Sequence, residues 1–254
     1  MRLDVEIAWL SAVFLLALRI GPLFVLTPVF GGSALPVNLR VMLGLALAAL
    51  MASVHPQWQA LVPVETGALL AAALAELMLG AALAFGLMCA FGAFLFGGRL
   101  LDIQIGFGVA TLFDPATRAA APLLGTALNM LALAVFFALD GHHLIIRAVA
   151  ESIANVPPGA GLARIDAATL VGAFGSMFAF GLAVVAPAVI TLLLLDVALG
   201  GVARTMPQMN IFIVAMPLKV AVGLWVLAVS VSQMGPLMHR IFESLVAYWR
   251  QLAG

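Results

Sequence analysis

Apolar residues along this 254-residue chain gather in long runs that short polar stretches separate. The runs occupy 7–30, 39–54, 67–97, 122–139, 169–199 and 211–238. A helix that crosses a bilayer needs about 20 apolar residues, with a range of about 17–25. The second run is shorter than this, and the third, fifth and sixth are longer. The pattern therefore predicts an all-α integral membrane protein whose helices are bent, or are covered by other proteins instead of lipid.

Prolines fall inside these runs as well as between them. Among those inside are Pro22, Pro187, Pro217 and Pro236. Because proline lacks the backbone N–H that a helix interior uses, each predicts a kinked or split helix. The expected fold consists of bent and broken helices.

The third run ends in the most unusual stretch of the chain, at 97–121. After Phe96 come two glycines, and the residues that follow are apolar, glycine-rich and bounded by Asp102 and Asp114. Non-helical backbone at membrane depth is tolerated only where protein buries it or where it lines a passage. An apolar, flexible loop can form a constriction there, since hydrophobic necks exclude water and ions. We therefore predict that the helix breaks after Phe96 and that a re-entrant-like loop here is the functional centre.

Composition supports membrane residence and excludes some functions. The chain is 65% hydrophobic and 9% charged, whereas soluble domains average about 45–50% apolar and about 25% charged residues. Its formal net charge of zero argues against nucleic acid as a partner, which would favour a basic patch. The single cysteine, Cys89, allows neither an internal disulfide nor a cysteine metal site.

Charged residues lie well inside the apolar runs at Arg19, Glu76, Asp196 and Lys219. Each costs at least about 2.5–3.5 kcal/mol in the membrane unless it is paired or faces a polar cavity. We expect structural ion pairs between helices. The alternative, an ion or proton pathway, would require more acidic residues along one helix face than the sequence contains.

The sequence contains no recognisable catalytic constellation. His142 and His143 adjoin Asp140, but adjacent helical residues point about 100° apart, and a helical zinc pair is spaced i, i+4. We expect a role at a turn or helix start, and no metal. A nucleophile elbow, a phosphate-binding loop and a dinucleotide fingerprint are absent from the sequence. Neither an enzymatic activity nor a cofactor is predicted.

Two polar stretches have the spacing of amphipathic helices. The connection at 140–168 carries Ile145, Ile146, Val149 and Ile153. The tail at 239–251 sets Ile241, Leu245, Tyr248 and Trp249 against Arg240, Glu243 and Arg250. Such stretches are expected at a membrane interface or against partner proteins.

A polar string follows the fifth run. Arg204 and Gln208 are four residues apart, but Pro207 prevents a continuous helix between them. Gln208 and Asn210 offer both donors and acceptors, which suits a broken backbone held in a protein interior. Lys219 lies in the run that comes next.

Short motifs follow one another in order along nearly the whole chain. They are Pro28 with Gly31, then 36–40, Glu76 with Gly80, Asp102 with Gln104 and Gly106, Asp114-Pro115 with Pro122, Gly141-His142, Pro187, and 204–219. This ordered set resembles the FliR family of flagellar export-gate proteins and its virulence secretion counterparts, the SctT, HrcT or SpaR group. The residues Phe113-Asp114-Pro115, followed by Pro122, favour the flagellar branch of the family.

The resemblance implies a core subunit of the type III protein export gate, in the bacterial inner membrane at the flagellar basal body. In that family a single copy joins several copies of FliP-like and FliQ-like membrane subunits, and an FlhB-like protein takes part in switching substrates. The exported substrates are unfolded proteins, and membrane lipid surrounds the assembly.

The resemblance also implies a domain plan and site residues. A FliP-like half at 1–140 contains a plug loop at 105–121, an amphipathic connection fills 141–168, and a FliQ-like helical hairpin with an amphipathic tail fills 169–254. The implied plug or gate residues are Ile105, Gly106, Phe107, Gly108, Val109, Leu112, Phe113, Asp114 and Pro115. The implied structural or interface residues are Glu76, Asp102, Gln104, Arg204, Gln208, Asn210 and Lys219.

The sequence leaves alternatives open. The virulence branch of the family shares most of these motifs. A small-molecule transporter would need corresponding helix breaks in two similar halves, and Pro22 and Pro187 do not lie in matching surroundings. An intramembrane enzyme would need an acid, histidine or nucleophile cluster at useful spacing, which the sequence lacks.

Overall fold

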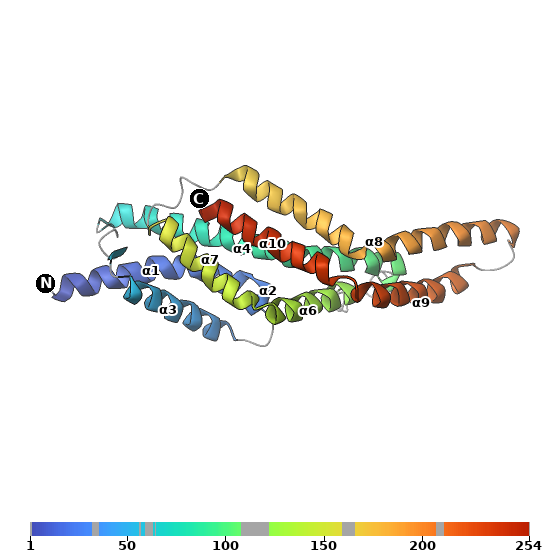
Figure 1. The fold of residues 1–254 in the computed structure, drawn as a ribbon, viewed down its shortest axis with the longest axis horizontal. Coiled ribbons are helices and arrows are strands. Elements are labelled where there is room, and N and C mark those ends of the chain that lie inside the picture. The colour runs from blue at the N-terminus through green and yellow to red at the C-terminus, as the bar shows by residue number, and fades with distance from the viewer. Residues whose placement is uncertain are drawn as a thin grey trace. The chain divides into compact units, whose positions relative to one another are not determined.

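The computed structural model describes residues 2–31, 36–55, 57–58, 63, 65–107, 122–158, 166–206 and 211–253. Throughout this part of the chain the regular structure is helical, without strands (Figure 1). The helices are α1 (Arg2–Leu26), α2 (Pro28–Gly31), α3 (Val37–Val54), α4 (Thr66–Ile105), α6 (Leu123–Ala138), α7 (Gly141–Asn155), α8 (Ala167–Thr205), α9 (Ile211–Val231) and α10 (Gly235–Ala253). The prediction of an all-α protein is confirmed.

Five of these helices are long and apolar enough to cross a membrane. The spans are Ile7–Leu26 in α1, Val37–Val54 in α3, Thr66–Ile105 in α4, Ala167–Thr205 in α8 and Ile213–Val231 in α9. If α6 and α7 form one broken span, the described residues provide six. α4 and α8 have 40 and 39 residues, about twice the length that one bilayer crossing needs. The chain is therefore a membrane protein whose longest helices exceed an ordinary span.

Three of the prolines selected in the apolar runs lie inside continuous helices. Pro22 is inside α1, Pro187 inside α8 and Pro217 inside α9. Pro236 is the second residue of α10, where the missing N–H has no helical partner to lose. Of the two predicted outcomes, a kinked or a split helix, splitting does not occur at these residues, because membrane helices tolerate proline where neighbouring groups satisfy the freed backbone.

α4 also corrects the expected helix break after Phe96, because it continues through Gly97 and Gly98 for another two turns. The two glycines mark close contacts between helices. A Cβ atom on Gly97 would lie 2.5 Å from the carbonyl oxygen of Gly181 in α8. One on Gly98 would lie 2.3 Å from the Cα atom of Gly125 in α6. Glycine therefore serves close packing here, and α4 remains intact.

Two compact units make up the chain, and each combines segments that are distant in sequence. The first contains Met1–Cys89, Phe137–Phe174 and Glu243–Gly254, and the second contains Ala90–Phe136 and Gly175–Phe242. Since α4 and α8 each contribute residues to both units, long helices rather than chain order organise the fold.

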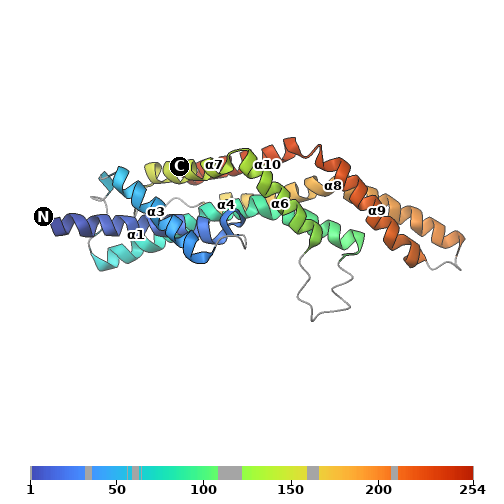
Figure 2. The same cartoon turned by 90° about the horizontal axis from the view of Figure 1, so that it is seen from below.

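In the first unit, α1 and α3 lie side by side (Figure 2), and the end of α10 packs on α4. The hydroxyl of Tyr248 donates to the carbonyl oxygen of Ala82 at 2.7 Å. The indole N–H of Trp249 donates to the carbonyl oxygen of Leu83 at 3.0 Å. Burial raises the pKa of the Tyr248 phenol above its ordinary value, so the hydroxyl keeps the proton that it donates. Gly86 leaves room for the tyrosine, because a Cβ atom there would lie 2.4 Å from the ring.

The amphipathic predictions hold at most positions. In α7, Ile145, Val149 and Ile153 are buried, whereas Ile146 is 41% exposed. The expected place of Ile146 on the buried face is wrong, since it points about 100° away from its neighbour. In α10, the predicted apolar residues are all buried, namely Ile241, Leu245, Tyr248 and Trp249. The chain itself therefore covers the apolar face of its tail.

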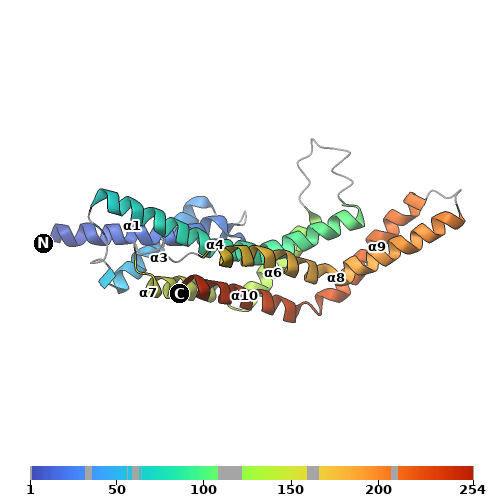
Figure 3. The same cartoon turned by 90° about the horizontal axis from the view of Figure 1, so that it is seen from above.

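Aromatic contacts and a helical hairpin organise the second unit. The rings of Phe91, Phe136 and Phe242 form a cluster with centroids 5.2 to 6.0 Å apart. Phe96 of α4 meets Phe178 of α8 edge to face at 4.9 Å. The later part of α8 lies beside α9 (Figure 3), where Asp196 and Lys219 form an ion pair. This unit contains the end of α4, where the predicted plug begins.

Candidate functional site

The predicted plug begins where α4 ends. Ile105 is the last residue of α4 and is fully buried, and Gly106 follows with φ +101°, a conformation that favours glycine. The N–H of Gly106 donates to the carbonyl oxygens of Asp102 and Ile103, both at 3.2 Å, and the positive φ of Gly106 then stops the helix. Phe107 is half-buried. The remaining predicted plug residues lie outside the described residues: Gly108, Val109, Leu112, Phe113, Asp114 and Pro115.

A cavity of about 350 Å³ lies beside this helix end. α4 contributes Gln104 and Ile105 to its lining, Gly106 follows them, α8 contributes Asp196, and α9 contributes Met216 and Lys219. The side-chain amide of Gln104 donates to a carbonyl oxygen of α8 at 3.4 Å. A Cβ atom on Gly106 would lie 3.0 Å from the sulfur of Met216. The structure thus brings four predicted site residues, Gln104, Ile105, Gly106 and Lys219, to one place.

Asp102 joins the end of α4 to the start of α6. Its carboxylate is 4% exposed and accepts the backbone N–H groups of Leu124 at 3.0 Å and Gly125 at 3.3 Å. These groups belong to the first turn of α6, whose donors have no partner within their own helix. A carboxylate at the positive end of the helix dipole is favourable, and losing such a cap costs about 1 kcal/mol.

Sequence reasoning selected Asp102 as a polar residue and missed what it binds. The available signal was spacing, since Gly98 and Asp102 are four residues apart and share one face of α4. Pro122 directly before α6 is a second signal, because proline is common at helix starts. A glycine and an acidic residue on one face, with a helix start ahead, predict a close crossing and a cap.

Arg19 and Glu76 form an ion pair between α1 and α4, and both side chains are fully buried. The guanidinium donates to both carboxylate oxygens, from Nε at 2.5 Å and from Nη2 at 2.8 Å. Its Nη1 donates to the carbonyl oxygens of Ser152 at 3.0 Å and Val156 at 2.9 Å. These contacts compensate the loss of hydration that burial imposes on both charges. Gly80 permits the approach, because a Cβ atom there would lie 2.2 Å from the carbonyl oxygen of Arg19.

Asp196 of α8 and Lys219 of α9 form a second ion pair, with side chains 39% and 23% exposed. The expectation that the charges in the apolar runs pair between helices is confirmed. Arg204 is exposed in the last turn of α8, where the helix dipole favours a cation. The helix ends at Thr205, ahead of Pro207 as expected. Two further predicted interface residues, Gln208 and Asn210, lie outside the described residues.

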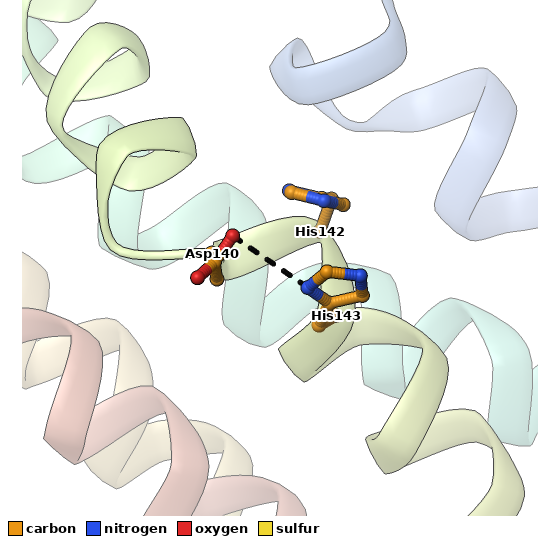
Figure 4. Close-up of side chains that lie close together, drawn as sticks. All are labelled: Asp140, His142 and His143. Carbon is orange, nitrogen blue, oxygen red and sulfur yellow. Dashed lines mark ion pairs between the residues drawn. The ribbon is translucent and has the colours of Figure 1, made fainter.

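Asp140, His142 and His143 come together at the start of α7 (Figure 4). One ligand atom of each lies within 4.8 Å of the others, and Nδ1 of His143 is 3.6 Å from an oxygen of Asp140. The expected divergence of the two imidazoles is not found, since the two ring centroids lie 4.1 Å apart. Asp140 precedes α7 in a turn with φ 56°, so the three side chains lie at a helix start, as expected from the sequence for the histidines.

These features define a class: an α-helical membrane protein whose helices are joined by ion pairs, one of them fully buried, and by a capped junction between α4 and α6. Comparison with known families gives the narrower identity. Residues 10–245 match the model of the bacterial export proteins, family 1, and the chain belongs to that family.

Curated relatives cover almost the full chain. It is 31% identical to the flagellar biosynthetic protein FliR of Bacillus subtilis (strain 168) over 246 residues, which are 95% of this chain and 94% of the relative. It is 31% identical to FliR of Escherichia coli (strain K12) over 241 residues, 94% and 91% of the two chains. The secretion system apparatus protein SsaT of Salmonella typhimurium (strain LT2) is 29% identical over 172 residues, 66% and 65% of the two chains. The resemblance drawn from short motifs is confirmed.

Proposed function

We propose that the chain is a core, non-enzymatic subunit of the bacterial flagellar type III protein export gate, in the inner membrane. The observation that carries the proposal is the match to relatives named flagellar biosynthetic protein FliR over more than nine-tenths of both chains. The helical membrane fold supports it, and so do two helices too long for simple spans. Unfolded flagellar proteins are the substrates that the gate would pass.

The closing element in this proposal is the apolar segment 105–121. Its sequence offers bulky apolar side chains such as Leu112 and Phe113, which exclude water and ions from a narrow passage. Gly106 supports a hinge, because its φ of +101° stops α4 and turns the chain out of the helix. An unfolded substrate would push this segment aside.

Partner subunits complete the gate in this proposal. Large apolar side chains are exposed on α3, α8 and α9, among them Met42 at 66%, Val197 at 75% and Trp225 at 70%. Exposed apolar surface marks contact with protein or membrane, and the lengths of α4 and α8 favour protein. We assign a FliP-like half to 1–140, a connection to 141–168 and a FliQ-like hairpin to 169–254. FliP-like and FliQ-like subunits and an FlhB-like switch protein are the proposed partners.

Loss of the plug is expected to make the assembled gate leak ions. Deleting residues 105–116, or replacing Leu112 and Phe113 by glycine, removes the bulky apolar groups that exclude water. Ion flux into vesicles that carry the purified complex measures the leak. The conservative variants Leu112→Val and Phe113→Leu keep apolar bulk and are expected to remain tight. Glycine variants that assemble normally and stay ion-tight would show that the plug assignment is wrong.

The match to SsaT supports a second candidate function, in a virulence secretion apparatus. That match covers 66% of this chain, against 95% for the Bacillus relative, so the flagellar function is preferred. In a strain that has lost swimming because its own FliR protein was deleted, this chain is expected to restore swimming in soft agar. The matched test supplies the chain to a strain that lacks SsaT. Rescue of secretion there, without rescue of swimming, would overturn the preference.

A further inference from the structure

We infer that Asp102 is a positioning residue of the gate, whose carboxylate holds the start of α6 against the end of α4 and so fixes both ends of the segment between them. The inference rests on the proposed role of that segment as the plug. The contact belongs to four residues, Gly98, Asp102, Leu124 and Gly125, which are called the α4–α6 anchor below.

The anchor brings the two ends of the segment to one side chain. Asp102 lies in the last turn of α4, and Leu124 and Gly125 lie in the first turn of α6. The two N–H···O contacts, at 3.0 and 3.3 Å, place one carboxylate oxygen on each N–H group. A single residue thus spans the gap between the helix that precedes the segment and the helix that follows it.

A second contact lies one turn earlier on α4. The backbones meet at Gly98 and Gly125, where a Cβ atom on Gly98 would lie 2.3 Å from the Cα atom of Gly125. A Cβ atom on Gly125 would lie 3.1 Å from the carbonyl oxygen of Leu95. Because these contacts and the carboxylate are separated along α4, they resist rotation of α6 as well as its withdrawal.

Asp102 makes hydrogen bonds on both sides of the segment. Its carbonyl oxygen accepts the N–H of Gly106, while its side chain caps α6. The positive φ of Gly106 ends α4 one turn after Asp102. The carboxylate of Asp102 therefore fixes where α6 begins relative to the last turn of α4.

The hydrogen bonds of the α4–α6 anchor are stronger than those between neutral groups. A carboxylate that accepts backbone N–H groups at a helix start forms charge-assisted bonds, and the 4% exposure of Asp102 removes competition from water. Without that acceptor, the first-turn N–H groups of α6 have no partner in their own helix. The start of α6 would then shift toward other acceptors, and the ends of the segment would separate.

The test compares three variants in the complex purified from its host membrane. Asp102→Leu keeps the bulk of the side chain and removes the acceptor, whereas Asp102→Asn keeps one oxygen at a position where asparagine is a good cap. Asp166→Leu is the matched control, because Asp166 caps α8 through the N–H of Ala168 at 3.1 Å and does not adjoin the segment. Each complex is assayed for subunit content, for ion leak in vesicles, and for the dipolar coupling between spin labels at Ile103 and Leu123. Both label sites are exposed, and Cys89 is replaced by alanine.

Loss of one helix cap costs about 1 kcal/mol, which corresponds to roughly a fivefold change in an equilibrium constant. Asp102→Leu is therefore expected to weaken the coupling between the labels and to raise ion leak by about this factor. Asp102→Asn and Asp166→Leu are expected to resemble the unmodified complex. Unchanged coupling in Asp102→Leu overturns the inference, as does equal leak in all three variants. Failure of Asp102→Leu to assemble also overturns it, because the residue would then act in folding and not in positioning. If deletion of 105–116 leaves the complex tight, the proposed plug fails, whereas the label coupling still decides whether the anchor exists.

Discussion

Glu76→Ala is expected to prevent the chain from accumulating in folded form. The substitution leaves the Arg19 guanidinium fully buried with carbonyl acceptors and no counter-ion. Breaking a buried ion pair by removing one partner costs about 3–5 kcal/mol, a large share of the about 5–15 kcal/mol that keeps a typical domain folded. The amount of chain in membranes and the midpoint of its thermal unfolding in detergent measure the effect.

Two matched variants show whether the unpaired charge is the cause. Glu151→Ala removes the same side chain from an exposed position on α7, and it is expected to change the unfolding midpoint little. The double variant Arg19→Met with Glu76→Leu removes both charges, and it is expected to recover part of the loss, since apolar pairs often replace buried ion pairs well. Equal stability of Glu76→Ala and Glu151→Ala would contradict the importance of the pair.

The pairing of charges was predictable because the membrane penalises an unpaired charge wherever the partner lies. That argument requires only the presence of Arg19, Glu76, Asp196 and Lys219 in apolar runs. It does not assign partners, since a sequence without tertiary contacts cannot tell which helices are neighbours. The structure supplies the assignment, α1 with α4 and α8 with α9.

The roles of Gly97 and Gly98 were not predictable in the same way. Glycine lowers helix stability, which favours a break in the helix. Glycine also permits close contact between helices, which favours a continuous helix. The expectation of a break after Phe96 followed the first effect, whereas the contacts with Gly181 and Gly125 show the second. A local pattern cannot choose between them, because the choice depends on what packs against that face.

The location of the candidate site was predictable, but the contacts that hold it in place were not. The family resemblance placed the start of the plug at Ile105, where α4 ends in the structure, whereas the glycine pattern had placed the helix break after Phe96. That Asp102 caps α6 depends on a contact across 22 residues. Local spacing predicted the polar residue, and only the packing of α4 on α6 reveals its partner.

Gly80→Ala is expected to disturb the fold more than any alanine at an open glycine. Its Cβ atom would lie 2.2 Å from the oxygen, 2.8 Å from the carbon and 2.9 Å from the Cα atom of Arg19. These are backbone atoms of α1, so α1 and α4 would have to separate. Overpacking of this kind typically costs about 1–3 kcal/mol, and separation would also stretch the bonds between Arg19 and Glu76, which lies one helical turn before Gly80.

Gly21→Ala provides the matched control, because Gly21 lies inside α1 and a Cβ atom there would have no neighbouring atom within 4 Å. Alanine in an open helical position is expected to stabilise by up to about 1 kcal/mol. The two variants should therefore shift the thermal midpoint in opposite directions. If Gly80→Ala behaves like Gly21→Ala, α1 and α4 are not in backbone contact at Gly80. If the drop in the thermal midpoint caused by Gly80→Ala disappears in the Arg19→Met, Glu76→Leu background, the cost comes from the ion pair. If the drop persists in that background, the cost comes from backbone contact.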